Sequence, residues 1–145
     1  MAKLGSRAGW SGNYCHDLTE ATSLTPGDSG KVFFLNSTAE FEVTLPSVAD
    51  AGAGFNVKFI VKSAPSGVSY TISEKASADT DVMITNGINE LEVDTGDDGP
   101  SNTGHTSLVF TQGVSIQGDW AEFLCDGTNW YVTGQTKADG GVTFV

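Results

Sequence analysis

A Gly-Asp-Ser-Gly stretch at residues 27–30 is the first place where residue types could do chemistry, because a serine in a tight glycine-rich turn is a candidate nucleophile. Such a serine needs a histidine base and an aspartate that orients the base. The two histidines, His16 and His105, lie near the N-terminal end and in a polar loop. The stretch is therefore predicted to be a turn before a strand, and no catalytic residue is assigned.

Patterns for binding phosphate or metal ions are also incomplete. Residues 29–31 (Ser-Gly-Lys) end like a P-loop, but Thr25 stands where the first glycine is required. The polar segment 94–106 begins like an EF-hand loop, yet Gly96 occupies a ligand position and His105 that of the chelating acid. The cysteines and histidines do not have zinc-ligand spacing. We expect no cofactor and no metal ion, with a calcium site of another kind in the acidic loop as the alternative.

Strand carboxylates and aromatic rings are the remaining candidates. Glu122 and six other glutamates could supply the acid pair of a glycosidase, but nothing in the sequence brings two together. Trp120, Trp130 and Tyr131 could stack on sugar rings, as in a carbohydrate-binding module. In a hairpin such rings also fill the core or form cross-strand pairs, which is the interpretation preferred here. The protein is predicted not to be an enzyme.

The charge of the chain limits its partners. Eighteen acidic residues against seven basic ones give a formal net charge of −11. Such a surface repels phosphate backbones and anionic membranes. Direct binding to nucleic acid or to a membrane is therefore not expected. The acidity keeps the protein soluble, and it would also prevent adhesion to nucleic acid packed nearby.

The cysteines and the N-terminal residues bear on the compartment. Cys15 and Cys125 are far apart, so each is predicted to be a free thiol or a small buried apolar group. A single disulfide that ties the N-terminal arm to the core is the alternative. The first residues include Lys3 and Arg7 but no apolar signal-peptide region, and no apolar run is long enough for a membrane span. We expect synthesis in a host cytoplasm without secretion.

Short strands separated by turn signals recur along the chain. The clearest is 55–62, where Phe55, Val57, Phe59 and Val61 alternate with polar residues, so that a slip of one residue would bury two lysines. Asn86-Gly87 is a strong hairpin dipeptide and is predicted to turn the chain between strands 81–85 and 90–93. The other strands are expected at 31–35, 41–45, 68–73, 107–110, 114–116, 119–125 and 129–133.

This pattern predicts an all-β fold. About eight to ten short antiparallel strands, with turns every 8–12 residues, are typical of a β-sandwich, a jelly roll or a small barrel. Residues 1–23 are glycine- and serine-rich and lack periodicity, so they are predicted to form an extended N-terminal arm. Residues 24–145 are predicted to form a single β domain.

Three stretches resemble bacteriophage virion proteins. They are residues 24–32 leading to 43–46, residues 54–61, and residues 118–123 followed by 126–132. Their order is similar to that of small phage head decoration (cement) proteins, and also to that of domains in phage tail fibres and spikes. The resemblance covers about residues 24 to 134. It implies a structural protein, commonly trimeric, that sits on the symmetry axes of a capsid.

A capsid-stabilising protein is accordingly the expected function. Its partners would be the major capsid protein and two further copies of this chain, in a homotrimer at three-fold positions on the outer capsid surface of the virion. Trp10 and Tyr14 in the arm and Val142 and Phe144 in the apolar tail are the candidate interface residues. The tail residues could instead complete an edge strand of their own domain. A receptor- or glycan-binding module of the tail is the alternative function.

Overall fold

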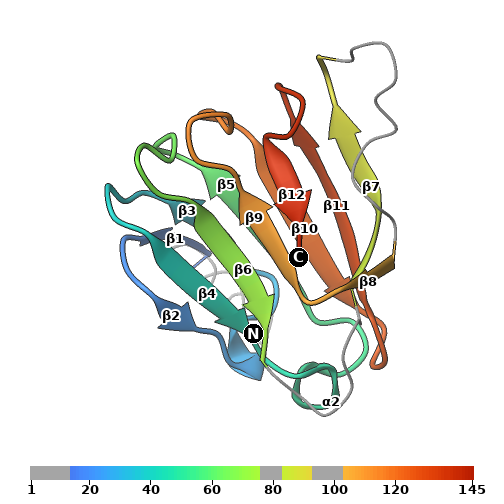
Figure 1. Ribbon diagram of the computed structural model, residues 1–145. Helices are drawn as coiled ribbons and strands as arrows, with labels where there is room; N and C mark the ends of the chain where they lie inside the picture. The colour runs from blue at the N-terminus through green and yellow to red at the C-terminus, as the bar shows by residue number, and fades with distance from the viewer. Residues whose placement is uncertain (1–13, 76–82, 93–102) are drawn as a thin grey trace, which may run out of the picture.

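The computed structural model describes residues 14–75, 83–92 and 103–145, which form two β-sheets packed face to face (Figure 1). The seven-stranded sheet contains, in spatial order, β1 (Cys15–Leu18), β3 (Val32–Leu35), β5 (Asn56–Val61), β10 (Trp120–Cys125), β11 (Trp130–Thr136), β7 (Met83–Glu90) and β8 (Thr103–His105). The five-stranded sheet contains β12 (Val142–Phe144), β9 (Ser107–Phe110), β6 (Tyr70–Glu74), β4 (Phe41–Leu45) and β2 (Thr22–Ser23). The predicted all-β sandwich is confirmed.

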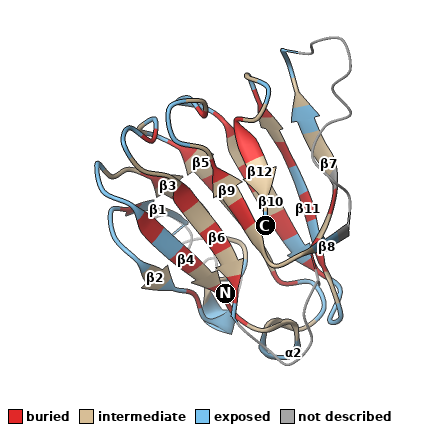
Figure 2. Cartoon of the chain, in the orientation of Figure 1, coloured by how far each residue is buried: buried red, intermediate tan, exposed pale blue. Residues whose placement is uncertain are grey.

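The core lies between the sheets because apolar residues alternate with polar ones along the strands (Figure 2). As predicted, Val57, Phe59 and Val61 of β5 point inward and are almost fully buried. Phe59 meets Phe123 of β10 edge-to-face, with 5.7 Å between ring centroids. Residues of β4, β6 and β9 supply the opposite wall of the core, which includes Val43, Leu45, Tyr70, Ile72, Leu108 and Phe110.

The strands are not all antiparallel, which corrects the prediction. Five of the ten strand pairings in the described residues are parallel. From β1 to β6 the chain enters the other sheet after every strand, so strands that become neighbours in one sheet run in the same direction. The turns between these strands connect the two sheets.

The expected hairpin at Asn86-Gly87 is also wrong. Residues 83–90 form one continuous strand, β7, which runs parallel to β11. The glycine is needed for a close approach: a Cβ atom on Gly87 would lie 2.6 Å from Thr133 Cγ2 and 2.9 Å from the Val132 carbonyl oxygen. The register of β11 shifts at this point, between Tyr131 and Thr133. Gly87 therefore marks a tight contact between strands and not a turn.

The domain begins earlier than residue 24. β1 and β2 lie within the predicted arm of residues 1–23, yet each is hydrogen-bonded into a sheet. Leu18 is buried in the core, and the amide of Val32 donates a hydrogen bond to the Tyr14 carbonyl oxygen. An arm outside the domain can therefore include at most residues 1–13, which lie outside the described residues.

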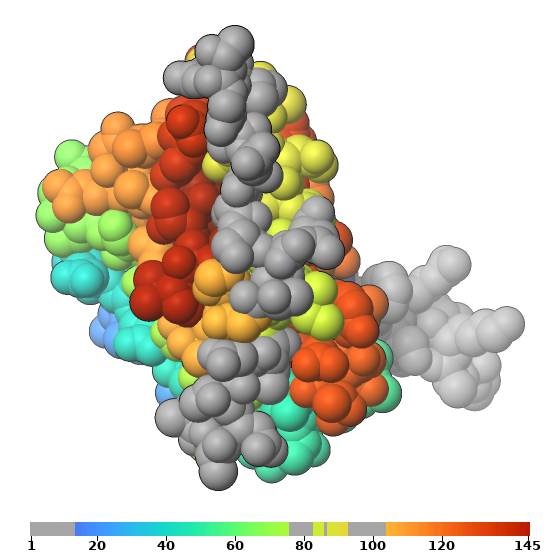
Figure 3. All heavy atoms as spheres, turned by 45° about the vertical axis from the view of Figure 1, so that its right-hand side comes forward, coloured from blue at the N-terminus to red at the C-terminus, as the bar shows by residue number. Residues whose placement is uncertain are grey.

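The C-terminal tail completes its own domain. β12 pairs with β9, and the amides of Thr106 and Ser107 both donate hydrogen bonds to the Val145 carbonyl oxygen, at 2.9 and 3.0 Å. Thr106 is the single residue between β8 of one sheet and β9 of the other. Figure 3 shows this side of the molecule, with the C-terminal residues in dark red. The edge-strand alternative for the tail is thus confirmed.

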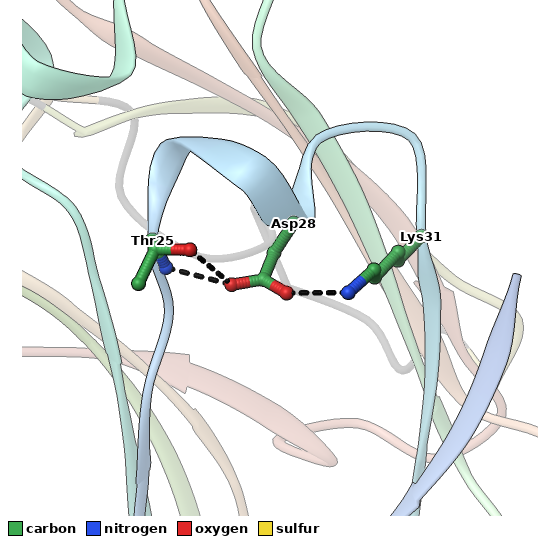
Figure 4. A network of polar contacts seen from close by, with 3 residues as sticks. All are labelled: Thr25, Asp28 and Lys31. Atoms are coloured by element: carbon green, nitrogen blue, oxygen red, sulfur yellow. Dashed lines mark hydrogen bonds and ion pairs between the residues drawn. The ribbon is translucent and has the colours of Figure 1, made fainter. Parts of the chain in front are cut away.

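The Gly-Asp-Ser-Gly stretch is a turn, as predicted. Pro26–Asp28 form a single 3-10 turn, η1, that precedes β3. The Asp28 carboxylate accepts hydrogen bonds from the Thr25 amide and hydroxyl, at 2.7 and 2.9 Å, and its other oxygen pairs with the Lys31 ammonium at 2.7 Å (Figure 4). Burial raises the pKa of Asp28, but the bonds from Lys31 and Thr25 outweigh burial and lower it.

Replacing Asp28 with Asn should remove part of the acid sensitivity of the fold. A carboxyl group whose pKa is lowered by folding stabilises the folded state above its unfolded value, which is about 3.9. That contribution disappears as the pH falls through the lowered pKa. Asp28→Asn should reduce the free energy of unfolding by about 1 kcal/mol at pH 7 and by much less once the pH is below the lowered pKa of Asp28. Urea unfolding at several pH values measures the difference, and Asp50→Asn, at an exposed site, is the control.

Adding a methyl group at Gly134 should destabilise the sandwich. A Cβ atom there would lie 2.3 Å from the Trp120 carbonyl oxygen and 3.0 Å from Ala121 Cα, both in the backbone of β10. Gly134→Ala should cost about 1–3 kcal/mol because the two central strands would have to separate. Gly27→Ala is the control, since its Cβ atom would meet only Thr25 Oγ1 at 3.6 Å. Equal urea midpoints for the two variants would contradict the close packing of β10 on β11.

Candidate interaction surface

The outer face of the seven-stranded sheet is the most distinctive surface of the described residues. Alternate residues of β3, β5, β10, β11 and β7 point away from the core and are half-buried or exposed. Strand register places them in rows that continue across the sheet. We call this surface the aromatic face; it comprises Val32, Phe34, Lys58, Ile60, Trp120, Glu122, Leu124, Tyr131, Thr133, Gln135 and Ile84.

Trp120 begins β10, the central strand of the seven-stranded sheet, and its side chain lies on the aromatic face. In the register of the sheet it stands between Ile60 of β5 and Gln135 of β11. The Lys58 ammonium lies over its ring, 3.8 Å from the ring centroid. This cation–π contact fixes both side chains and occupies one face of the indole. Beyond the next row, which contains Lys58, Glu122 and Thr133, Leu124 and Tyr131 are paired across β10 and β11 and are 47% and 40% exposed.

The opposite outer face has different chemistry. The residues of β4, β6, β9 and β12 that point away from the core are mainly hydroxyl-bearing: Thr44, Thr71, Ser73, Ser107 and Thr143, with Glu42 and Val109. Ser73 and Ser107 share a hydrogen bond of 3.2 Å between their hydroxyl groups. A face of this composition is well solvated and needs no partner. The apolar side chains on the other sheet are therefore a local property and not a general feature of the surface.

The charges on the aromatic face are balanced. At one edge the Lys62 ammonium forms an ion pair with Asp17 of β1, and it lies 5.9 Å from the centroid of the Phe34 ring. The hydrogen bond from Lys62 is the main cause of the lowered pKa of Asp17, which also accepts one from Asn36. Towards the centre, Lys58 and Glu122 are register neighbours. Two cations thus meet two anions on a protein whose net charge is −11.

Asp119 positions the strand that carries Trp120, and sequence analysis did not single it out. Its carboxylate is buried and accepts four hydrogen bonds. Oδ2 receives the Ser115 hydroxyl at 2.9 Å, the Ile116 amide at 2.9 Å and the Thr136 hydroxyl at 3.1 Å, and Oδ1 receives the Lys137 amide at 3.0 Å. This network also explains why residues 114–116 form a turn where a strand was predicted. The only sequence signal was an acidic residue directly before an apolar strand.

The hairpin between β10 and β11 orients Tyr131. Asp126 caps the turn by accepting the amides of Thr128 and Asn129, both at 2.7 Å. These bonds, led by that from Asn129, lower the pKa of Asp126. The negative charge of Asp126 and a hydrogen bond to it raise the pKa of Tyr131. The phenol ring is held at the edge of the aromatic face in its neutral form.

Three of the four candidate interface residues lie in the part of the chain that the structure describes. Val142 is 1% exposed in the core of its own domain, so its predicted place at an interface is wrong. Phe144 is half-buried beside His105, with 5.4 Å between ring centroids. Tyr14 is 47% exposed, next to Cys15 of β1. Trp10 lies outside the described residues.

The tryptophans have separate roles. Trp130 is fully buried between Phe55 and Phe123, as the preferred interpretation predicted, whereas Trp120 lies on the aromatic face. Cys15 is an exposed free thiol and Cys125 a buried one, so the two are not bonded to each other. Residues 94–102 of the acidic loop lie outside the described residues. Elsewhere, in the described ranges, no three His, Cys, Asp or Glu residues group as metal ligands, and no helix is long and apolar enough to cross a membrane.

No protein-family model, curated protein or solved structure matches this chain.

Replacing Asp119 should destabilise the fold and loosen Trp120. Asp119→Ala leaves four donors without their acceptor and should lower the free energy of unfolding by about 3 kcal/mol. Asp119→Asn keeps the shape but places an NH2 group against at least one of those donors, so a smaller loss is expected. Chemical denaturation followed by far-UV circular dichroism measures both. Asp126→Asn, in an exposed turn, is the control; a loss of under about 0.5 kcal/mol for Asp119→Ala would contradict the role of the network.

Proposed function

We propose that this protein is a structural component of a bacteriophage virion. It would bind the outer surface of the capsid and stabilise the shell, as a homotrimer at three-fold positions. The observation that carries the proposal is the aromatic face, which supports the homotrimer: exposed Leu124 and Tyr131 lie with Ile60 and Trp120 on one outer side of the larger sheet, beside nearly balanced charges. Such a surface is typical of proteins whose function is to adhere to other proteins.

The mechanics of the fold support this proposal. A shell filled with nucleic acid under pressure gains stability from rigid clamps that bridge neighbouring subunits. Two packed sheets with an aromatic core resist deformation. Several copies related by symmetry would each hold the shell, so that weak individual contacts give a strong total attachment. The net charge of −11 would reduce adhesion of the protein to nucleic acid.

A glycan-binding module of a phage tail is the second candidate. Trp120 and Tyr131 favour it, because both rings lie on one outer face. Two observations weigh against it. Trp130, the third ring of the suggested platform, is buried in the core, and the Lys58 ammonium already covers one side of the Trp120 ring. A sugar would have to use the remaining side or the Tyr131 ring alone.

Capsid binding tests the proposed function directly. Purified protein mixed with emptied capsids of the phage whose genome encodes it should sediment with them and raise the temperature at which they rupture. Trp10→Ala should weaken this binding about tenfold or more, the usual cost of truncating an anchoring tryptophan. Thr71→Ala, on the hydroxyl-rich outer face, is the control.

Two outcomes are informative in different ways. If Trp10→Ala and wild-type protein bind capsids with equal affinity, Trp10 is not part of the capsid interface. The proposed capsid binding itself would not be contradicted. Absence of wild-type protein from the capsid pellet, together with binding to polysaccharide of the host cell, would replace the proposal with the glycan-binding alternative.

A further inference from the structure

We infer that the aromatic face is the contact surface between copies of this chain. This inference rests on the homo-oligomer of the proposed function and assigns that oligomer a surface. Three faces of this kind turned toward a common three-fold axis would bury their apolar residues against one another. Attachment to the capsid would then use a different part of the chain.

Exposed apolar side chains give the first argument. Leu124 and Tyr131 are about half exposed although they lie on central strands of the larger sheet. Phe34, Ile60 and Trp120 form a second apolar row towards the β1 edge. The row that contains Lys58, Glu122 and Thr133 lies between the two apolar rows. Burying such side chains against a second protein surface removes apolar area from water and so favours association.

Charge identifies a second copy as the occupant. The chain carries eighteen acidic and seven basic residues, so two copies repel each other over most of their surfaces. On the aromatic face, in contrast, Lys58 and Lys62 balance Asp17 and Glu122. Two of the seven basic residues of the chain thus lie on or beside this face, against Asp17, Glu122 and, at the Tyr131 edge, Asp126. An equally acidic second copy meets less repulsion here than the net charge of −11 produces over the chain as a whole.

Lys58 and Glu122 make the face self-complementary. They are register neighbours on β5 and β10, yet Lys58 points its ammonium at the Trp120 ring. Among the ion pairs found in the described residues, none involves Glu122. The carboxylate of one copy is therefore available to the ammonium of the next. In a closed ring each copy offers Glu122 to a neighbour and Lys58 to the other neighbour, so every charge is used once.

The mass of the full-length protein in the absence of capsids tests this inference. Wild-type protein should have the mass of a trimer in sedimentation equilibrium at micromolar concentration. Glu122→Lys places like charges on the face and should weaken association at least tenfold. The control is Glu42→Lys, the same change of charge at an exposed site on the hydroxyl-rich outer face, which should leave the mass unchanged. Circular dichroism verifies that both variants are folded.

A charge exchange makes the test specific. Combining Lys58→Glu with Glu122→Lys restores opposite charges between copies and should recover most of the trimer that Glu122→Lys loses, even though the contact with Trp120 is gone. Leu124→Ser should also shift the mass towards the monomer.

If wild-type protein has the mass of a monomer at every concentration, the inference is wrong. It is also wrong if Glu122→Lys and Leu124→Ser leave the mass of the trimer unchanged, as Glu42→Lys is expected to do. Quenching of Trp120 fluorescence by host polysaccharide in a monomeric protein would assign the face to a glycan instead. The mass of the protein is measured without capsids, whereas the proposed function is tested by sedimentation with capsids. The contact between copies can therefore be disproved while capsid binding is observed, and the reverse.

Discussion

The buried carboxylate of Asp119 is the interaction on which the arrangement of the central strands depends. Removing a charge from water is costly unless donors replace the water, and here four donors do so. These donors come from the turn before β10 and from the end of β11. The Asp119 side chain therefore links the first strand of the hairpin to the second at its open end. The Asp119 carbonyl oxygen also accepts the Val61 amide at 2.8 Å, which ties the end of β5 to the same point. Trp120 is the next residue in the chain. The hydrogen bonds of Asp119 therefore hold the backbone that places the Trp120 side chain on the aromatic face.

The path of the chain produces two outer faces of different character. Because the first six strands alternate between the sheets, each sheet receives every second strand of the N-terminal half. The β1, β3 and β5 set carries Phe34, Ile60 and lysines outward, whereas the β2, β4 and β6 set carries mainly threonine and serine. Along each strand, apolar and polar side chains alternate, which places one set in the core and the other on the surface. The distribution of strands between the sheets then gives one outer surface the residues of the aromatic face and the other mainly hydroxyl groups.

These features together describe a protein suited to assembly. A stiff sandwich holds its outer side chains in a fixed pattern, so contacts with neighbours need little rearrangement. The excess of acid favours solubility of free copies, while the nearly balanced charges of the aromatic face favour association there. The proposed capsid attachment and the proposed contact between copies use different surfaces of the same domain. They can therefore be separated by mutation.

The sequence by itself determined the all-β class and the inward set of the clearest strands. At 55–62 the alternation of apolar and polar residues is a local property of the strand, and the structure places Phe55, Val57, Phe59 and Val61 in the core as expected. Which strands become neighbours depends on contacts between distant residues. Asn86-Gly87 illustrates this: the dipeptide favours a hairpin, but the approach of Thr133 and the pairing with β11 make it part of one strand. Only the tertiary structure separated Trp130 from Trp120, moved Val142 into the core and brought β1 into the domain, because burial depends on what lies opposite a side chain and that is not encoded within its own segment.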